Sequence, residues 1–261
     1  MSTSQRIAWI VVPFKEQLEF DRHVHLGQLL HAVGEHVRDM PSTAFDVQVV
    51  VVEQLDHERT GTRKFNRGKL LNAGFNEIWN NTEGVFARSA RPDDIFVAHD
   101  VDLIPNRDLF ACYGEATHGR AIHLARSWGR YATSDGSYVG GILAMTCRDL
   151  RRVNGYSSRY WGWGGEDDDF RVRMAACEIS VNPPSSVDGC VQDLERLGLR
   201  EKLDMLRMSG AKCTDKWELR RSSARRWPSD GLSSLRYRLC AVDNSQCDDG
   251  PLTCVTMRVL L

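Results

Sequence analysis

Long apolar runs are absent from this chain of 261 residues, which excludes a predicted membrane-spanning helix of about 20 apolar residues. An excess of charge of one sign is also absent, because 34 lysines and arginines accompany 35 aspartates and glutamates. No overall electrostatic field therefore favours nucleic acid or an anionic membrane as a partner. Any specific partner must be recognised at a local site.

Repeats, low-complexity tracts and Pro/Gly-rich linkers are also missing, which favours a single domain. No Cys-x-x-Cys pair occurs, which argues against a zinc ribbon. The eight cysteines suit either a secreted fold with a few disulfides or a cytosolic fold with buried thiols, and the composition does not decide between them. The apolar run 7–12 is too short for a signal-peptide core, so we interpret it as the first strand and expect no secretory signal in this chain.

The first half of the chain alternates between strand and helix patterns. It predicts strands at 7–14, 47–52 and 95–100, with helices at 18–37 and 66–80, and Asn66 as the N-cap of the second helix. This alternation predicts a mostly parallel sheet that binds ligands at the carboxyl ends of its strands. The second half is less regular. It predicts strands near 121–126, 138–145, 179–182, 235–242 and 254–260, helices near 147–154 and 167–177, and a charged segment at 193–226.

The segment 158–172 is the most informative part of the chain. Trp161 and Trp163 stand among three glycines, and four consecutive carboxylates, at 166–169, come directly before an apolar helical pattern. A Gly-rich hinge that carries aromatics and ends in acids can move over a ligand and present a base to it. The alternative is a turn followed by an acidic helix start, favoured by the helix dipole. That alternative leaves the two tryptophans between glycines unexplained.

Asp100 and Asp102 end the apolar strand that begins at Ile95. In an extended chain these two carboxylates point the same way and can approach one divalent cation from the same side. Such a cation could neutralise the diphosphate of a nucleotide-sugar. A phosphatase of the haloacid dehalogenase type is the competing interpretation, but its motif requires Thr two residues on, where this chain has Ile104.

Two further segments suggest ligand contact. Phe65 could stack on a base while Arg67 contacts a phosphate, although a solvated basic first turn of a helix is the alternative. Tyr138 precedes the paired glycines Gly140 and Gly141, which indicate either close approach of a ligand to the backbone or a bulge.

Together these residues resemble the catalytic domain of the β-1,4-galactosyltransferase family, nearest to its xylosylprotein galactosyltransferase branch. The similar segments occur in the family's order and span nearly the whole chain. They are 12–15, 65–67, 70–75, 99–105, 138–143, 154–155, 160–169 and 230–235.

The resemblance implies an α/β GT-A fold, a Rossmann-like mixed sheet flanked by helices. It implies one catalytic domain over 1–261, with a nucleotide-binding half at 7–105 and an acceptor-binding half at 106–261. It also implies UDP-galactose as donor, Mn²⁺ as cofactor with Mg²⁺ as a second candidate, and inversion at the transferred sugar carbon. The expected acceptor is a glycan or glycoside, with xylose on protein as a candidate, and no nucleic-acid partner or membrane segment is expected.

The resemblance also implies roles for individual residues. Asp167 would be the general base, Glu166 an acceptor contact and Trp163 the swinging tryptophan, while Tyr138 would favour galactose over its N-acetylated relative. Asp102 would bind the metal, with Asp100 beside it. The residues expected to hold the donor are Pro13, Phe14, Lys15, Phe65, Arg67, Asp100 and Tyr138.

The chain departs from the family at the metal site. Relatives supply a metal-binding histidine after the acidic helix, yet all eight histidines here precede residue 124. The corresponding stretch is 190–197, where Glu195, with Asp193 nearby, could substitute as an oxygen ligand. The alternative is that these acids form a solvated helix face and the site is incomplete. Lys15 also replaces the usual Arg, which keeps the charge but loses the bidentate fork.

Relatives work in the Golgi lumen behind an N-terminal anchor, whereas the first predicted strand here begins at residue 7. We therefore expect the Golgi lumen by resemblance and keep the cytoplasm as the alternative.

The leading functional hypothesis is a metal-dependent inverting galactosyltransferase. The main alternative is a degenerate member that binds a nucleotide-sugar or glycan without transfer, because of the missing histidine. An unrelated interaction module is a third interpretation, and the ordered matches argue against it.

Overall fold

The computed structural model describes residues 5–16, 21–41, 44–56, 64–127, 138–246 and 252–261. Within these residues, eight strands form one mixed sheet in the order β7-β5-β6-β3-β1-β2-β10-β9, and β4 pairs with β8 in a small second sheet. The strands are β1 (Ile7–Phe14), β2 (Asp46–Gln54), β3 (Ile95–His99), β4 (Leu103–Pro105), β5 (Arg120–His123), β6 (Ile142–Thr146), β7 (Ser180–Asn182), β8 (Val191–Asp193), β9 (Arg238–Gln246) and β10 (Thr253–Leu260).

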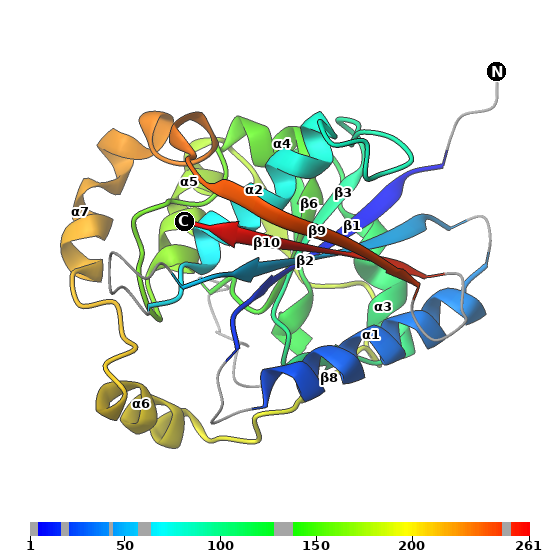
Figure 1. Ribbon diagram of the computed structural model, residues 1–261, viewed down its shortest axis with the longest axis horizontal. Coiled ribbons are helices and arrows are strands. Elements are labelled where there is room, and N and C mark those ends of the chain that lie inside the picture. The colour runs from blue at the N-terminus through cyan, green and yellow to red at the C-terminus, as the bar shows by residue number, and fades with distance from the viewer. Residues whose placement is uncertain (1–4, 17–20, 42–43, 57–63, 128–137, 247–251) are drawn as a thin grey trace.

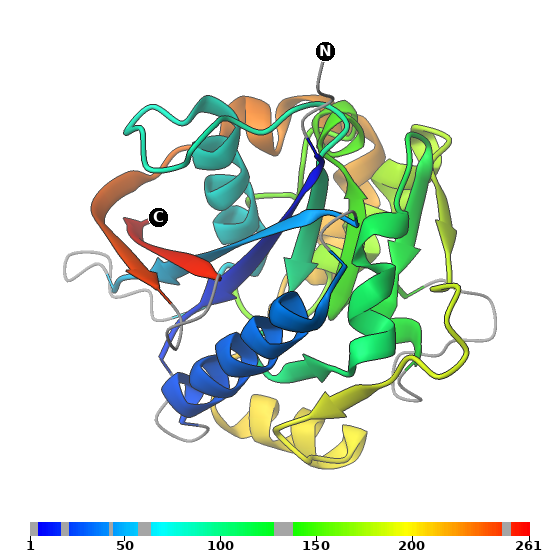
Figure 2. The ribbon, with the colours of Figure 1, turned by 90° about the vertical axis from the view of Figure 1, so that its right-hand side faces the viewer.

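Helices cover both faces of the large sheet (Figures 1 and 2). The α-helices are α1 (Arg22–Asp39), α2 (Arg67–Asn80), α3 (Arg107–Ala111), α4 (Cys147–Arg152), α5 (Glu166–Ala176), α6 (Leu199–Met208) and α7 (Lys216–Arg226). Short 3₁₀ turns are η2 (Cys112–Glu115), η3 (Leu124–Ser127), η4 (Trp227–Ser229) and η5 (Leu232–Ser234). Figure 1 places α6 and α7 at the outside of the molecule, away from the central strands.

Alternating side chains of β1 supply two separate hydrophobic cores. Trp9 and Val11 pack on the face covered by α2, α4 and α5, whereas Ile10 and Val12 pack on the face covered by α1 and α3. Both faces are therefore buried, which explains why β1 and β2 are nearly continuous apolar runs. Helix α2 lies very close to the sheet, because a Cβ on Gly74 would come within 2.7 Å of Val11.

Strand directions create one edge where the loops gather. β1 runs parallel to β2 and β3, and β10 runs parallel to β2. β6 runs antiparallel to β3 and β5, and β9 runs antiparallel to β10. The carboxyl ends of β1, β2 and β3 therefore lie at the same edge as the segment that enters β6. The sheet is mixed, as the GT-A expectation implies, and less parallel than strand and helix alternation alone predicts.

Most predicted elements are present with shifted ends. The predicted strand at 95–100 ends at His99, and the predicted strand at 138–145 begins only at Ile142, because Gly141 has a φ of +84° that interrupts the extended chain. The helix predicted from 18 begins at Arg22, and 18–20 lie outside the described residues. The β4–β8 pair and α3 were not predicted, since strands of three residues show too little periodicity. The charged segment forms β8's last residue, α6 and α7.

Asn66 fixes the start of α2, as predicted. Its side chain accepts a hydrogen bond from the backbone N of Lys69 at 2.9 Å and donates one to the carbonyl of Ser158 at 2.9 Å. Its backbone N donates to the side chain of Gln54 at the end of β2, also at 2.9 Å. These contacts hold Arg67, the first residue of α2, at the edge where the strands end.

No helix among the described residues is both long enough and apolar enough to cross a membrane. The seven cysteines within the described residues are all free thiols, and Cys247 lies outside those residues.

Candidate active site

One arginine joins two carboxylates at the carboxyl edge of the sheet. Arg67 Nε donates to Asp100 Oδ1 at 2.6 Å, and Arg67 Nη1 donates to Asp167 Oδ1 at 2.9 Å. The three residues come from the start of α2, the end of β3 and the first turn of α5. Arg67 is only 9% exposed, so its charge is offset mainly by these two acids.

Tyr138 and Asp167 converge on the backbone of Gly140. A Cβ built on Gly140 would lie 2.3 Å from the Tyr138 hydroxyl oxygen and 2.4 Å from Asp167 Oδ2, so no larger residue fits there without moving both groups. The carbonyl of Gly140 accepts a hydrogen bond from His123 Nε2 at 2.8 Å, which fixes this backbone. The paired-glycine pattern therefore marks a close approach, here by two side chains of the same chain.

Burial changes the pKa values of the acids in this group. Desolvation, and then the charge of Asp167, raises the pKa of Glu166 to about 8. Desolvation raises the pKa of Asp100 to about 6 and also raises that of Asp167, while Arg67 opposes both shifts. Glu166 therefore keeps its proton at neutral pH and can donate a hydrogen bond. Asp167 is a stronger base than an exposed aspartate.

The raised pKa of Glu166 gives a prediction about stability. The unfolded chain releases the Glu166 proton above its ordinary pKa of 4.5, while the folded chain retains it up to about pH 8. This ionisation therefore lowers the free energy of unfolding progressively between these two values. Glu166→Gln cannot ionise, so we expect it to gain stability over the wild type by roughly a few kcal/mol as the pH rises from 5 to 8.

Urea unfolding of both proteins at about pH 5, 6.5 and 8 measures this difference. These pH values span roughly the interval between the unfolded and folded pKa values of Glu166. Glu218→Gln, at an exposed position in the first turn of α7, is the matched control and should show no such trend. A difference between Glu166→Gln and wild type that does not grow with pH would contradict the raised pKa.

The Gly-rich segment before α5 uses its glycines for backbone conformation. Gly162, Gly164 and Gly165 have φ values of +93°, +103° and +106°, in the left-handed region that favours glycine. Between them Trp163 is 38% exposed, and its backbone N donates to the carbonyl of Ala211 at 2.8 Å. The segment is therefore a glycine loop that carries an exposed indole, as the sequence predicts. Swinging of Trp163 remains a prediction.

Three other acids form a second group. Ligand oxygens of Asp102, Asp193 and Glu195 all lie within 4.8 Å of one another. The β4–β8 pair brings them together, because Leu103 pairs with Asp193 and the backbone N of Leu194 donates to the carbonyl of Asp102 at 2.9 Å.

Two cations bind this cluster of Asp102, Asp193 and Glu195, which we call the acidic cluster. Arg22 Nη1 lies 3.1 Å from Asp102 Oδ2, and Arg22 Nη2 lies 2.5 Å from Glu195 Oε1. Lys202 Nζ contacts both carboxylate oxygens of Glu195. Burial alone would raise the pKa of Asp102, but the neighbouring positive charges of Arg22 and Lys202 lower it overall.

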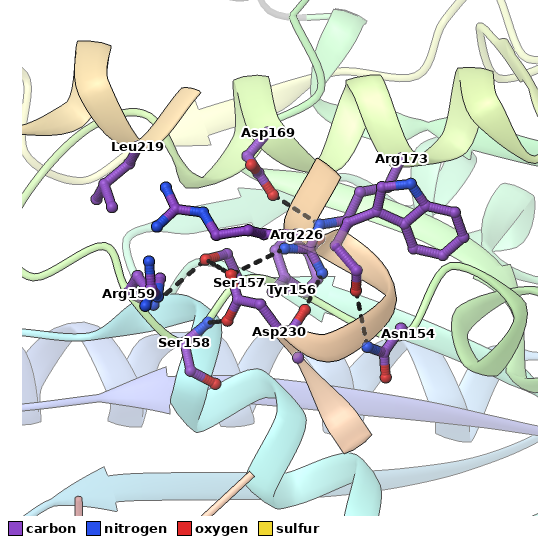
Figure 3. A network of polar contacts seen from close by, with 12 residues as sticks. Asn154, Tyr156, Ser157, Ser158, Arg159, Asp169, Arg173, Leu219, Arg226 and Asp230 are labelled. Atoms are coloured by element: carbon purple, nitrogen blue, oxygen red, sulfur yellow. Dashed lines mark hydrogen bonds and ion pairs between the residues drawn. The ribbon is translucent and has the colours of Figure 1, made fainter. Parts of the chain in front are cut away.

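A buried arginine anchors α5, the helix that carries Asp167. Arg173 is fully buried and its Nε donates to Asp169 Oδ2 at 2.6 Å, one turn earlier in α5 (Figure 3). Its Nη1 donates to the carbonyls of Gly155 at 3.1 Å and Asp230 at 2.6 Å. The Asp230 carboxylate in turn accepts from the Ser157 hydroxyl at 2.6 Å. This network ties α5 to the segment that follows η4.

Two family models match most of the chain. The model described as the N-terminal region of glycosyl transferase group 7 matches residues 2–113, and the model described as the N-terminal domain of galactosyltransferase matches residues 120–196. The chain belongs to the β-1,4-galactosyltransferase family.

Relatives and solved structures agree with this assignment. Over 244 residues the chain is 33% identical to β-1,4-galactosyltransferase 4 of Mus musculus, an alignment that covers 92% of this chain and 61% of that protein. The chain thus spans less than two thirds of that relative's length. A crystal structure of the catalytic domain of Drosophila β-1,4-galactosyltransferase 7 with xylobiose superposes with a TM-score of 0.71 at 24% identity, covering 98% of this chain and 94% of that chain. A mutant of the Drosophila protein with manganese, UDP-Gal and xylobiose gives 0.69 at 24% identity, covering 98% and 94%. The GT-A fold implied by the resemblance is thereby confirmed.

The structure brings the family's candidate catalytic and donor residues together in part. One group of predicted residues is close together in space. Its members are Arg67, Asp100, Tyr138, Glu166 and Asp167. At the end of β1, Pro13 and Phe14 are buried, and Lys15 pairs with Asp56. The carbonyl of Phe65 accepts from the backbone N of Gly162 at 2.7 Å, which links the predicted donor segment to the glycine loop.

Asp100 and Asp102 pair with different arginines, and their joint binding of one cation stays a prediction. The chain leaves β3 at His99 and enters a turn, so the alternation of an extended strand does not apply to these two residues. Asp100 pairs with Arg67, whereas Asp102 pairs with Arg22 and belongs to the acidic cluster.

The acidic cluster fits Mn²⁺ or Mg²⁺ in the type of its donors, because carboxylate oxygens suit both ions. Glu195 and Asp193 lie beside Asp102, where the sequence comparison expects substitutes for the missing histidine. Oxygens of two of these acids are already paired, however: Asp102 with Arg22, and Glu195 with both Arg22 and Lys202. A divalent ion at this cluster would have to displace at least part of these ion pairs.

Arg22 and Lys202 were not predicted from the sequence. Arg22 lies 80 residues from Asp102 and 173 from Glu195, so no local spacing reveals these contacts. The one available signal was indirect: replacement of the family's histidines by acids leaves negative charge that a buried site must balance.

Proposed function

We propose that this chain is an inverting galactosyltransferase that transfers galactose from UDP-galactose to a sugar acceptor in a β-1,4 linkage. The observation that carries the proposal is the convergence of the Asp167 carboxylate, the Tyr138 hydroxyl and the Arg67 guanidinium at the carboxyl edge of the sheet. Membership of the β-1,4-galactosyltransferase family supports it.

In the proposed reaction Asp167 removes the proton from the acceptor hydroxyl as that oxygen forms a bond to the anomeric carbon of galactose. The bond between that carbon and the UDP oxygen breaks, and its electron pair leaves with the diphosphate. Arg67 orients Asp167 and opposes the effect of burial on its pKa. Glu166, protonated at neutral pH, donates a hydrogen bond to the acceptor. Closure of the loop that carries Trp163 would exclude water.

The leaving diphosphate gains negative charge, which a cation near Asp102 would stabilise. The resemblance implies Mn²⁺, with Mg²⁺ as a second candidate, and Asp102, Asp193 and Glu195 would hold that ion, with Asp100 outside the cluster. Manganese in the structure of the Drosophila protein supports this expectation. Because Arg22 and Lys202 bind the same oxygens, metal dependence needs a measurement separate from that of transfer.

The acceptor proposal is narrower. Xylobiose in the Drosophila structures supports xylose on protein as the first acceptor to test. Tyr138 beside Asp167 supports galactose as the donor sugar, since a bulky ring leaves little room for an N-acetyl group. A location in the Golgi lumen remains a proposal that the family suggests, and localisation of the tagged full-length protein would test it.

The experiment that tests the function is transfer from UDP-galactose to a β-xyloside and to a β-N-acetylglucosaminide, with Mn²⁺ and with chelator. Transfer to either acceptor supports the enzyme and names the acceptor class. Donor binding without turnover on either acceptor would favour the alternative function, binding of a nucleotide-sugar or glycan without transfer. The ion pairs that already engage Asp167, Asp102 and Glu195 are the observation that keeps this alternative open.

Gly140→Ala tests the convergence directly. An added Cβ would clash with the Tyr138 hydroxyl and Asp167 Oδ2, so both groups must move from their positions. Displacement of catalytic groups by about 1 Å costs on the order of 100-fold in rate, and we expect that loss in kcat/KM. Gly27→Ala, in α1 with open space around its Cβ position, is the control and should transfer at the wild-type rate. Full activity of Gly140→Ala would remove the convergence from the mechanism.

A further inference from the structure

Arg22 is held inside the protein at the edge where the strands end. It is the first residue of α1, its side chain is only 10% exposed, and it reaches acids from two other parts of the chain. The next residue, His23, packs its ring against Phe14 at the end of β1, with ring centroids 5.0 Å apart. Arg22 therefore lies between the ends of β1 and β3, where the proposed donor site is.

The guanidinium bridges two of the three acids of the acidic cluster. One terminal nitrogen lies 3.1 Å from Asp102, and the other lies 2.5 Å from Glu195. Its planar fork matches carboxylate oxygens on two sides at once. Lys202 neutralises Glu195 as well, so two positive side chains accompany the three carboxylates of the acidic cluster.

A divalent ion would bind this cluster at a high cost. Displacing Arg22 would break two ion pairs with partly or fully buried carboxylates, in a site with little solvent. His25 is the histidine in hydrogen-bonding contact with Arg22, and its Nδ1 lies 3.4 Å from Arg22 Nη1. The guanidinium thus contacts two of the three carboxylates of the acidic cluster and the His25 ring.

We infer that Arg22 is the resident cation of the acidic cluster and that it takes the place of a divalent metal in stabilising the leaving diphosphate. This inference rests on the proposed galactosyl transfer. When the bond between the anomeric carbon and the UDP oxygen breaks, the electron pair stays on the diphosphate, and the Arg22 guanidinium stabilises that charge. Asp102 and Glu195 hold the guanidinium in position, and Lys202 balances the remaining charge of Glu195.

The first test measures Mn²⁺ binding by calorimetry, with no donor or acceptor present. If Arg22 occupies the cation position, Arg22→Gln removes the printed cation partner of Asp102 and one of the two cations on Glu195, where Lys202 remains. The variant should then bind Mn²⁺ about tenfold or more tightly than the wild type. Arg148→Gln, which removes an arginine from an exposed ion pair with Asp93, should bind as the wild type does. Equal or weaker Mn²⁺ binding by Arg22→Gln would overturn the inference.

The second test measures UDP binding and galactose transfer in excess chelator. We expect the wild type to keep both, Arg22→Gln to lose roughly 100-fold in transfer, and Arg22→Lys to keep part of it because the charge remains. Thermal unfolding of each variant separates loss of folding from loss of charge. Abolition of wild-type transfer by chelator would overturn the inference. If neither the wild type nor any variant transfers galactose, with or without Mn²⁺, the proposed function fails. The role of Arg22 is then tested by binding alone: in chelator, UDP should bind the wild type more tightly than it binds Arg22→Gln.

Discussion

Asp167→Asn is expected to lower galactose transfer by about two powers of ten or more, the usual scale for the loss of a general base. The amide keeps the size of the side chain and can still lie beside Arg67 and Tyr138, but it cannot accept the proton of the acceptor hydroxyl. We expect UDP-galactose to bind the variant nearly as well as it binds the wild type. Initial rates at saturating donor and acceptor, together with donor binding by calorimetry, measure both quantities.

Asp168→Asn is the matched control for this prediction. Asp168 is the next residue in the same first turn of α5, but its side chain is 39% exposed and its ion-pair partner is Arg220, at 3.8 Å. The substitution changes the charge near the helix N-terminus equally and should leave transfer within about twofold, because exposed pairs contribute little. Wild-type turnover by Asp167→Asn would remove Asp167 from the role of base. Equal losses of transfer in Asp167→Asn and Asp168→Asn would mean that the negative charge near the helix N-terminus, and not proton abstraction by Asp167, accounts for the effect.

Arg173→Met is expected to have the largest effect on stability. The substitution leaves the buried carboxylate of Asp169 without its cation (Figure 3). It also removes the donor to the carbonyls of Gly155 and Asp230. Removing one partner of a buried ion pair typically costs roughly 3–5 kcal/mol, because an uncompensated charge remains buried. For a domain of this size that corresponds to a fall of about 10 °C in Tm. Urea and thermal unfolding measure the loss.

The same replacement at Arg207 provides the control. Arg207 forms an i, i+3 pair with Asp204 on α6, with side chains 72% and 50% exposed, so Arg207→Met should change the free energy of unfolding by less than about 0.5 kcal/mol. A small loss for Arg173→Met would mean that the network does not hold α5 in place. In that case the position of Asp167 must be determined by other contacts.

The sequence was sufficient for the elements with strong patterns. The apolar runs of β1, β2 and β3 are largely buried on both faces, and Asn66 is an N-cap with a local hydrogen bond. Asp167 and Glu166 could be proposed as site residues because they follow a glycine loop with tryptophans, a pattern that is contiguous along the chain. Periodicity and local capping are properties of neighbouring residues, so the sequence alone reveals them.

The acidic cluster shows what sequence patterns leave undetermined. Asp100 and Asp102 are two residues apart, yet a turn directs them to different arginines. Whether acids next to each other share a cation depends on the backbone geometry between them and on side chains from distant segments. Arg22 precedes Glu195 by 173 residues, and Lys202 follows it by seven. Neither contact can be predicted from the spacing along the chain. Tertiary contacts of this kind require the fold.

The place of β10 in the sheet affects how the protein must be made. β10 lies between β2 and β9 and pairs in parallel with β2, although about 200 residues separate them along the chain. During synthesis one edge of β2 therefore stays without its partner until residue 260 has left the ribosome. An unpaired apolar strand edge is a template for association with other chains. Nascent chains that stop before β10 are thus expected to need chaperone protection, and removal of 253–260 should cause aggregation.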